Sequence, residues 1–297
     1  MEETKTTKAR KPRKRKYESL EYAPSMIAKK CVWYGILIAM AIAFVAPIMF
    51  MFFGTFKTSQ ELARVPFDWL PDHWRLDNIK TLFTKLPFFL YLRNTLIIVF
   101  FNIVGSLVSN SLVAYGFSRI EWPGRDKVFI LVIITMILPF QVVMVPLYLL
   151  FSKLKWIGTF LPLTLTCFFG NSFYIFLLRQ FLVGIPQEIS SAAKIDGSGE
   201  FRIFWQLTLP LCKPALATVG IFAFIRSWND YIGPLIFLPD SKLFTLSLAI
   251  SKLKSNLDPQ WPLLMSAGTL MVLPVLLLFF VLQQYFIQGV TMSGIKG

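Results

Sequence analysis

The chain contains uncharged apolar runs that are too long for the core of a water-soluble domain. The first, at 31–53, has 23 residues without a charge. A helix rises about 1.5 Å per residue, so about 20 apolar residues cross a hydrocarbon layer of roughly 30 Å. Four more uncharged runs also reach this length: 94–117, 128–151, 157–178 and 261–287. We expect them to be helices, because backbone amides in lipid must be bonded within their own segment.

A sixth run, 215–238, is apolar but carries Arg226 and Asp230. We therefore predict an all-α membrane protein with six transmembrane helices. Composition agrees with this. Hydrophobic residues make up 55% of the chain and charged residues only 15%, against about 25% charged residues in a soluble protein.

The Lys and Arg residues predict the orientation of these helices. Ten of the thirty lie in the first 30 residues. With that arm in the cytoplasm, the inner segments hold 17 basic residues and the outer segments 11, as the positive-inside rule requires. We expect both termini to be cytoplasmic. The predicted organisation is a basic arm (1–30), a first helix with an extracytoplasmic segment (31–89), a membrane core (90–287) and a cytoplasmic tail (288–297).

The net charge of +14 does not indicate nucleic-acid binding. The basic arm adjoins an apolar run, where it orients the helix and meets anionic lipid headgroups. Cys31, Cys167 and Cys212 have no metal-ligand spacing, and the single histidine, His73, lies in a polar loop. We predict no metal site and no nucleic-acid partner.

A polar segment, 187–210, interrupts the apolar pattern between two spans. Pro186 suits the start of a helix, and Gly197 suits its left-handed stop. Ser198 is expected to cap a second helix, which would place Phe201, Phe204 and Trp205 on one face and end near Pro210. Two interpretations remain open: a unit that transmits force to the membrane helices, or an amphipathic loop resting on headgroups.

The run "AAKIDGSGEFRIFWQLTLPLCKPALATV" resembles the cytoplasmic EAA loop of ABC importer permeases. Further matches, in chain order, are "FKTSQEL", "NTLIIV", "GNSFYIFLLRQFL", "SWNDYIGPL" and "QQYFIQGVTMSGIKG". They cover nearly the whole chain and are similar to the sugar-transporting, maltose-type branch of that family.

The resemblance implies the type I ABC importer permease fold in the plasma membrane, and translocation of a sugar, with an oligosaccharide as the expected substrate in this branch. It implies a second permease subunit, two ATP-binding subunits (identical or different) and an extracytoplasmic solute-binding protein as partners. The chain has no G-x-x-x-x-G-K-[ST] phosphate loop. We therefore expect it to bind no cofactor and to be no enzyme, with ATP and Mg²⁺ used by the partner ATPase.

The resemblance also places the contact with the ATPase on 187–210. The expected residues are Glu188, Ser191, Ala192, Ala193, Asp196 and Gly197. Ser191 stands where the family pattern has glutamate, and it offers only a neutral hydrogen bond. Either Glu188, one turn earlier, substitutes for that acid, or the paired permease supplies the charged contact.

A substrate path needs polar groups inside the membrane bundle, and the candidates are Arg226, Asn229 and Asp230. Arg226 and Asp230 are four residues apart, so they could instead neutralise each other. Weaker candidates, each expected to form hydrogen bonds between helices, are Asn102, Asn110, Gln141 and Asn171.

Two other classes of function fit this sequence less well than the importer permease. A stand-alone secondary transporter or channel would show inverted repeats or several membrane-embedded acids, and this chain offers little of either. A membrane enzyme would need a nucleophile–base pair or metal ligands near the interface.

Overall fold

The computed structural model describes residues 24–254 and 260–294, and in these ranges the chain is helical. It divides into two compact units, Met1–Met49 and Phe50–Gly297. The first helix, α1 (Pro24–Gly54), carries the boundary between them and contains the predicted span 31–53. Most of the predicted arm, residues 1–23, lies outside the described residues.

The second unit begins with two short helices that form a structured segment after α1. They are α2 (Ser59–Leu62) and α3 (Asp77–Lys85). Thr58 and Glu61 form a capping box at the start of α2. The buried Lys57 donates to the carbonyl oxygen of Asp68, and Asn78 donates to the carbonyl oxygens of Thr55 and Lys57 at 2.8 and 2.9 Å.

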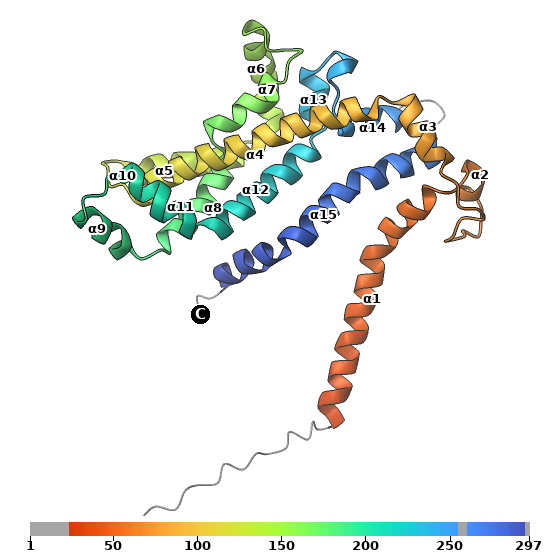
Figure 1. The fold of residues 1–297 in the computed structure, drawn as a ribbon, viewed down its shortest axis with the longest axis horizontal. Coiled ribbons are helices and arrows are strands. Elements are labelled where there is room, and N and C mark those ends of the chain that lie inside the picture. Colours follow the sequence, from red (N-terminus) through yellow and green to blue (C-terminus); the bar gives the residue numbers. More distant parts are fainter. Residues whose placement is uncertain (1–23, 255–259, 295–297) are drawn as a thin grey trace, which may run out of the picture. The chain divides into compact units, whose positions relative to one another are not determined.

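The membrane helices of this unit pack around α4. Figure 1 shows α4 (Phe88–Ser118) running beside α12 (Lys213–Trp228) and α8 (Ser172–Val183), and both contacts are extensive. A buried apolar cluster joins the three helices through residues such as Tyr115, Leu178 and Val219. The last helix, α15 (Trp261–Gly294), packs on α12, where the buried Trp228 indole donates to the carbonyl oxygen of Met271 at 3.0 Å.

The remaining elements are shorter and connect these helices. They are α5 (Arg125–Ile134), the 3₁₀ turn η1 (Thr135–Ile137), α6 (Phe140–Lys153), α7 (Leu161–Thr164), the 3₁₀ turn η2 (Leu165–Phe169), α9 (Gln187–Ile195), α10 (Glu200–Arg202), the π-helical turn η3 (Ile203–Thr208), α11 (Leu209–Leu211), α13 (Ile232–Phe237), the 3₁₀ turn η4 (Ser241–Leu243) and α14 (Leu246–Lys254).

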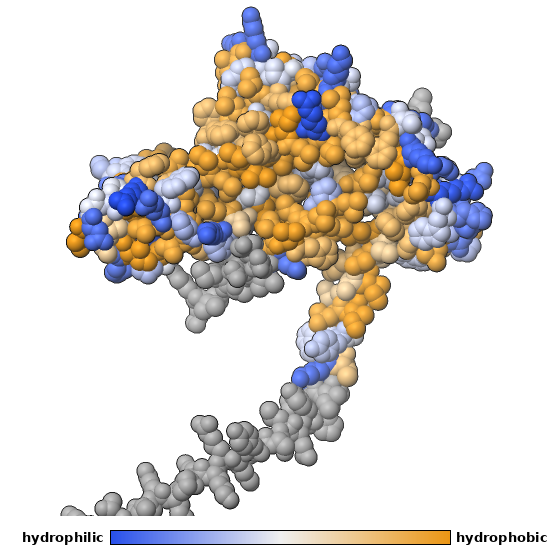
Figure 2. All heavy atoms as spheres, in the orientation of Figure 1, coloured by the Kyte–Doolittle hydropathy of each residue, from blue (hydrophilic) through white to orange (hydrophobic). Residues whose placement is uncertain are grey.

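The outer surface of the second unit is suited to lipid. Figure 2 shows hydrophobic atoms over the middle of this unit and hydrophilic atoms gathered near α9 and near α2. Large apolar side chains such as Phe100, Leu131 and Leu277 are exposed. An apolar surface this extensive would be unusual on a water-soluble monomer.

Four described helices are long and apolar enough to cross a membrane, and the number rises to six if each of two bent helix pairs counts as one span. The predictions for 94–117 and 261–287 are confirmed by α4 and α15, although both helices extend beyond the predicted bounds.

Three predicted spans are not continuous helices. In 128–151, the chain bends by 97° between η1 and α6. Leu138 is extended there (ψ 112°) because it precedes Pro139, whose ring disfavours the helical region for the residue before it. The span predicted at 157–178 instead runs from Leu161 to Val183 and is interrupted at Gly170, where φ is +91°.

The third correction concerns 215–238. Helix α12 ends at Trp228, and a separate helix, α13, begins at Ile232. Asp230 stabilises this break, because its carboxylate accepts a hydrogen bond from the Gly233 amide at 3.1 Å.

Helix α4 contains two glycines in contrasting surroundings, which gives a test of this packing. A Cβ atom on Gly105 would meet the Cys167 sulfur and approach the Phe168 ring to 2.9 Å, whereas one on Gly116 would meet nothing within 4 Å. We predict that Gly105→Ala lowers the free energy of unfolding by about 1 to 3 kcal/mol through overpacking. Gly116→Ala should leave it unchanged or raise it by up to about 1 kcal/mol. Thermal unfolding of both variants in detergent would measure this, and equal stability would contradict the packing of α4 on η2.

Candidate functional site

The polar segment between α8 and α12 begins with the helix α9, as predicted. Pro186 precedes it, Glu188 lies in its first turn and Lys194 in its last. It ends in a Schellman motif: the Gly197 amide donates to the Lys194 carbonyl at 3.0 Å, and the Ser198 amide to the Ala193 carbonyl at 2.9 Å. Gly197 adopts φ +79°, so the predicted left-handed stop is confirmed.

Most of the predicted contact residues on α9 point outward. Exposed positions are Glu188, Ser191, Ala192, Asp196 and Gly197, whereas Ala193 is buried. Helix α9 and the turn after it therefore present an exposed surface of small and acidic residues.

The second half of the segment differs from the prediction. Ser198 does not cap the next helix, because its backbone already closes α9; Gly199 is the N-cap of α10, and no side chain caps it. The π-helical turn then changes the side-chain spacing. Only Phe204 is buried (4% exposed), while Phe201 and Trp205 are 73% and 61% exposed. Pro210 lies inside α11 rather than after it, and a bend of 79° follows between Leu211 and Lys213.

Glu200 connects this segment to its surroundings. One of its oxygens lies 2.5 Å from Lys194 Nζ, and the other accepts a hydrogen bond from the Tyr115 hydroxyl at 2.7 Å. Lys194 and then Tyr115 hold the pKa of the Glu200 carboxyl below its usual value. Neither contact was predicted from the sequence. The contact with Tyr115 has no local signal, because Tyr115 lies 85 positions earlier in the chain.

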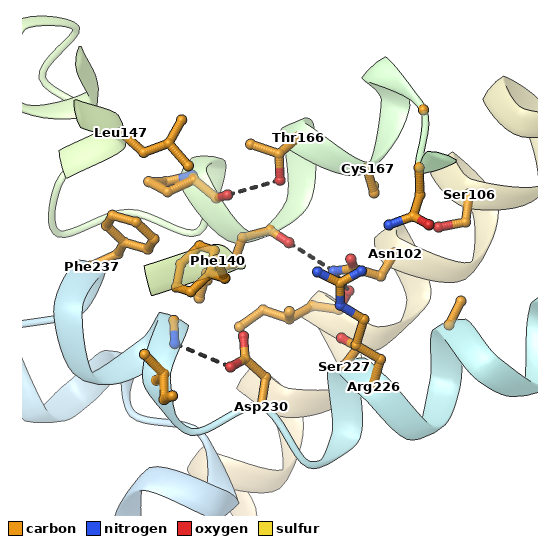
Figure 3. A pocket seen from close by; sticks show the side chains of 18 of the residues that line it. Asn102, Ser106, Phe140, Leu147, Thr166, Cys167, Arg226, Ser227, Asp230 and Phe237 are labelled. Carbon is orange, nitrogen blue, oxygen red and sulfur yellow. Dashed lines mark hydrogen bonds between the residues drawn. The ribbon is translucent and has the colours of Figure 1, made fainter. Parts of the chain in front are cut away.

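A second candidate site is a cavity of about 430 Å³ within the membrane helices. Figure 3 shows Arg226 and Asp230 in this cavity, with Asn102 contributed by α4. Its polar lining residues come from helices far apart in sequence: Asn102, Ser106, Gln141, Thr166, Asn171, Arg226, Ser227 and Asp230. Aromatic side chains, among them Phe140 and Tyr174, complete the wall.

The three predicted path residues are only partly brought together. Arg226 and Asp230 share the cavity, but in the part of the chain that the structure describes they form no ion pair with each other. Asn229 does not line the cavity; it ends α12 and its amide donates to the Ile225 carbonyl at 2.8 Å.

The predicted hydrogen bonds between helices are confirmed for two asparagines of α4. Asn102 donates to the Leu163 carbonyl at 2.7 Å, and Asn110 accepts from the Asn171 amide at 2.6 Å. Asn171 itself caps α8 with its side-chain oxygen. The Asn110 bond holds the irregular backbone beside Gly170 against α4, and the Asn102 bond holds α7 against the same helix.

Known proteins are similar to this chain in both sequence and fold. Residues 111–292 match the family described as "Binding-protein-dependent transport system inner membrane component". The chain is 32% identical to the arabinooligosaccharides transport system permease protein AraQ of Bacillus subtilis, over 94% of this chain and all of that one. It is 30% identical to the lactose transport system permease protein LacG of Rhizobium radiobacter, over 87% of this chain and 93% of that one.

A solved bacterial ABC transporter involved in the import of the acidic polysaccharide alginate contains a chain of the same fold. The TM-score is 0.79 at 23% identity, and the match covers 89% of this chain and 99% of that one. The family match spans more than half of this chain, and the relatives that align over nearly their full length are named as transport system permease proteins. This chain therefore belongs to the inner membrane components of binding-protein-dependent transport systems, and is a plasma-membrane permease subunit of an ABC importer.

Proposed function

We propose that this permease imports a sugar, and that the sugar is an oligosaccharide. Similar chains are named for arabinooligosaccharides and lactose, and the structural neighbour belongs to an alginate importer. The support is that these resemblances extend over nearly the whole chain. Family membership does not favour the alternative of a stand-alone secondary transporter or channel.

The subunit works in a larger complex. Its family implies an ATPase and a solute-binding protein in general. The specific assembly that we propose contains a second, different permease, two ATP-binding subunits and an extracytoplasmic binding protein, surrounded by membrane lipid. ATP and Mg²⁺ act in the ATP-binding subunits, since this chain has no phosphate loop.

In the proposed topology both termini and α9 face the cytoplasm. The excess of Lys and Arg in the segments on that side supports this orientation. Helix α9 then docks on an ATP-binding subunit and transmits its movement to the membrane helices. The observation that carries this role is the exposed surface of α9, whose small residues let another protein approach closely.

The charge of this docking surface differs from the family pattern. Ser191 is neutral, and Glu188 is the exposed acid on the same helix, one turn earlier. We propose that the Ser191 hydroxyl makes a hydrogen bond to the ATPase, with charged contacts supplied by Glu188 or by the second permease.

The cavity beside Arg226 and Asp230 is the proposed substrate path in this subunit. It combines charged and amide groups with aromatic faces, which suits the hydroxyl groups and apolar ring faces of a sugar.

The first prediction tests contact with the ATPase. In a chain lacking its three native cysteines, Ser191→Cys carrying a benzophenone label should crosslink to the ATP-binding subunit, because residue 191 is exposed on α9. Ala193→Cys is the matched control and should not crosslink, because that side chain is buried. Mass spectrometry of the product identifies the partner; labelling only of lipid, or by a reagent outside the cell, would refute the topology.

A second prediction concerns the stop of α9. Gly197→Val should abolish sugar uptake while membrane insertion stays normal, because a β-branched residue at φ +79° costs about 1 to 2 kcal/mol or more and displaces the docking surface. Gly199→Val is the control, since Gly199 has φ −71° and open space around it. Uptake of arabinotriose by intact cells, with immunoblots of the membrane fraction, measures both properties. Normal uptake by Gly197→Val would count against the role of α9.

A third prediction concerns the cavity. Because Arg226 forms no ion pair with Asp230 within the described residues, Arg226→Met should leave assembly of the complex intact. It should raise the KM for arabinotriose about tenfold, the effect of losing a hydrogen bond to a charged group. Asn229→Ala, outside the cavity, should leave KM unchanged. Failure of Arg226→Met to assemble would instead indicate a structural charge.

A further inference from the structure

The end of α4 and the end of α8 hold each other through two arginines. Arg119, which caps α4 and is buried, donates from Nη2 to the carbonyl oxygens of Leu182 and Ile185 at 2.6 and 2.8 Å. Arg179 of α8 donates from Nε to the Phe117 carbonyl near the end of α4 at 3.2 Å. The last carbonyls of a helix lack partners within it and carry partial negative charge, so cations stabilise both ends.

This pair of helix ends fixes the beginning of α9. Ile185 immediately precedes Pro186 and α9, so Arg119 anchors the chain where α9 starts. The other end of α9 leads into Gly197 and Gly199, residues with little intrinsic stiffness. Two backbone hydrogen bonds close the turn at Gly197, whereas a Cβ atom on Gly199 would meet nothing within 4 Å, so a side-chain contact across this bend would stiffen it further.

Glu200 spans that bend. Its carboxylate meets Lys194 on the α9 side and the Tyr115 hydroxyl of α4 on the other. Lys194 and Glu200 are about half exposed, so their ion pair alone contributes little. The Tyr115 contact is more shielded from solvent. The Tyr115 ring is buried and packs against Phe204, with 5.2 Å between the ring centroids. The hydrogen bond to a charged acceptor is also the stronger kind.

We propose that Glu200 is a positioning residue that ties the far end of α9 to α4 through Tyr115, so that α9 moves α4 as well as α8. This inference rests on the proposed docking of α9 to the ATPase. It assigns the coupling segment a second acid, placed not to contact the ATPase but to keep the docking helix stiffly mounted on the membrane helices.

The first test measures how rigidly the far end of α9 is held relative to α4. Spin labels at Ile120, just after α4, and at Ile195, the exposed last residue of α9, report the distance between the two elements in the assembled transporter. We expect a narrow distance distribution in the native chain and a broad one in Tyr115→Phe, which keeps the ring but loses the donor. Tyr91→Phe, at the other end of α4, is the matched control and should remain narrow. An unchanged distribution in Tyr115→Phe would overturn the proposal.

The second test measures coupling in proteoliposomes, as arabinotriose imported per ATP hydrolysed. Tyr115→Phe, Glu200→Ala and Lys194→Met should each lower this ratio, by up to about tenfold, with ATP hydrolysis retained, because the link from α9 to α4 passes through all three side chains. The double variant Tyr115→Phe/Glu200→Ala should be no worse than Glu200→Ala, because both changes remove one link. Additive losses would overturn the proposal.

The two proposals fail in different ways. If α9 does not contact the ATPase, the Ser191→Cys crosslink is absent while the spin-label distances still respond to Tyr115→Phe. If only the link through Glu200 is wrong, the crosslink forms and the distances do not respond.

Discussion

The structure depends on one constraint: a backbone amide within a hydrocarbon layer needs a partner from the protein, because no water is present to replace it. Long helices meet this constraint along α4 and α15. Where the helices break, side chains and neighbouring backbone supply the partners instead. Asp230 accepts from Gly233 after α12, Asn171 caps α8, and Asn110 accepts from the Asn171 amide.

These breaks meet at a single place. Phe140, directly after the bend at Pro139, lines the cavity together with Gly170 and Asn171 from the second break and Asp230 from the third. Irregular backbone at membrane depth is tolerated where it is buried in protein or lines a cavity. These three departures from regular helix therefore lie where polar groups can face a solute, as in other transporters, whereas the bend between α11 and α12 lies away from the cavity.

The sequence predicted the parts of this fold that depend on local chemistry. Apolar length identified α4 and α15, and Gly197 identified the end of α9, because a left-handed stop strongly prefers glycine. The breaks inside 128–151 and 215–238 were not predicted from the sequence, because a continuous and a bent apolar run have the same hydropathy. Pro139 was visible, but proline also occurs in unbroken membrane helices such as α15, which contains Pro274.

The same distinction applies to the candidate sites. Exposure of Ser191 and Ala192 follows from a short polar helix, but the position of Arg226 and Asp230 depends on the break between them and α13. A continuous helix would place side chains four residues apart on one face, where opposite charges meet. Helix α12 instead ends at Trp228, so Asp230 leaves the helical register and bonds the Gly233 amide, and both Arg226 and Asp230 line the cavity.

Helix α4 connects the two sites physically. Tyr115 lies at the segment that contains α9, and Asn102, on the same helix, lines the cavity. At about 1.5 Å per residue the two positions are roughly 20 Å apart along the helix axis. Asn102 also donates to the Leu163 carbonyl of α7, and both residues line the cavity. A rigid helix that is held at both places can convert movement of α9 into a change of cavity shape, without any need for the flexible connections to carry force.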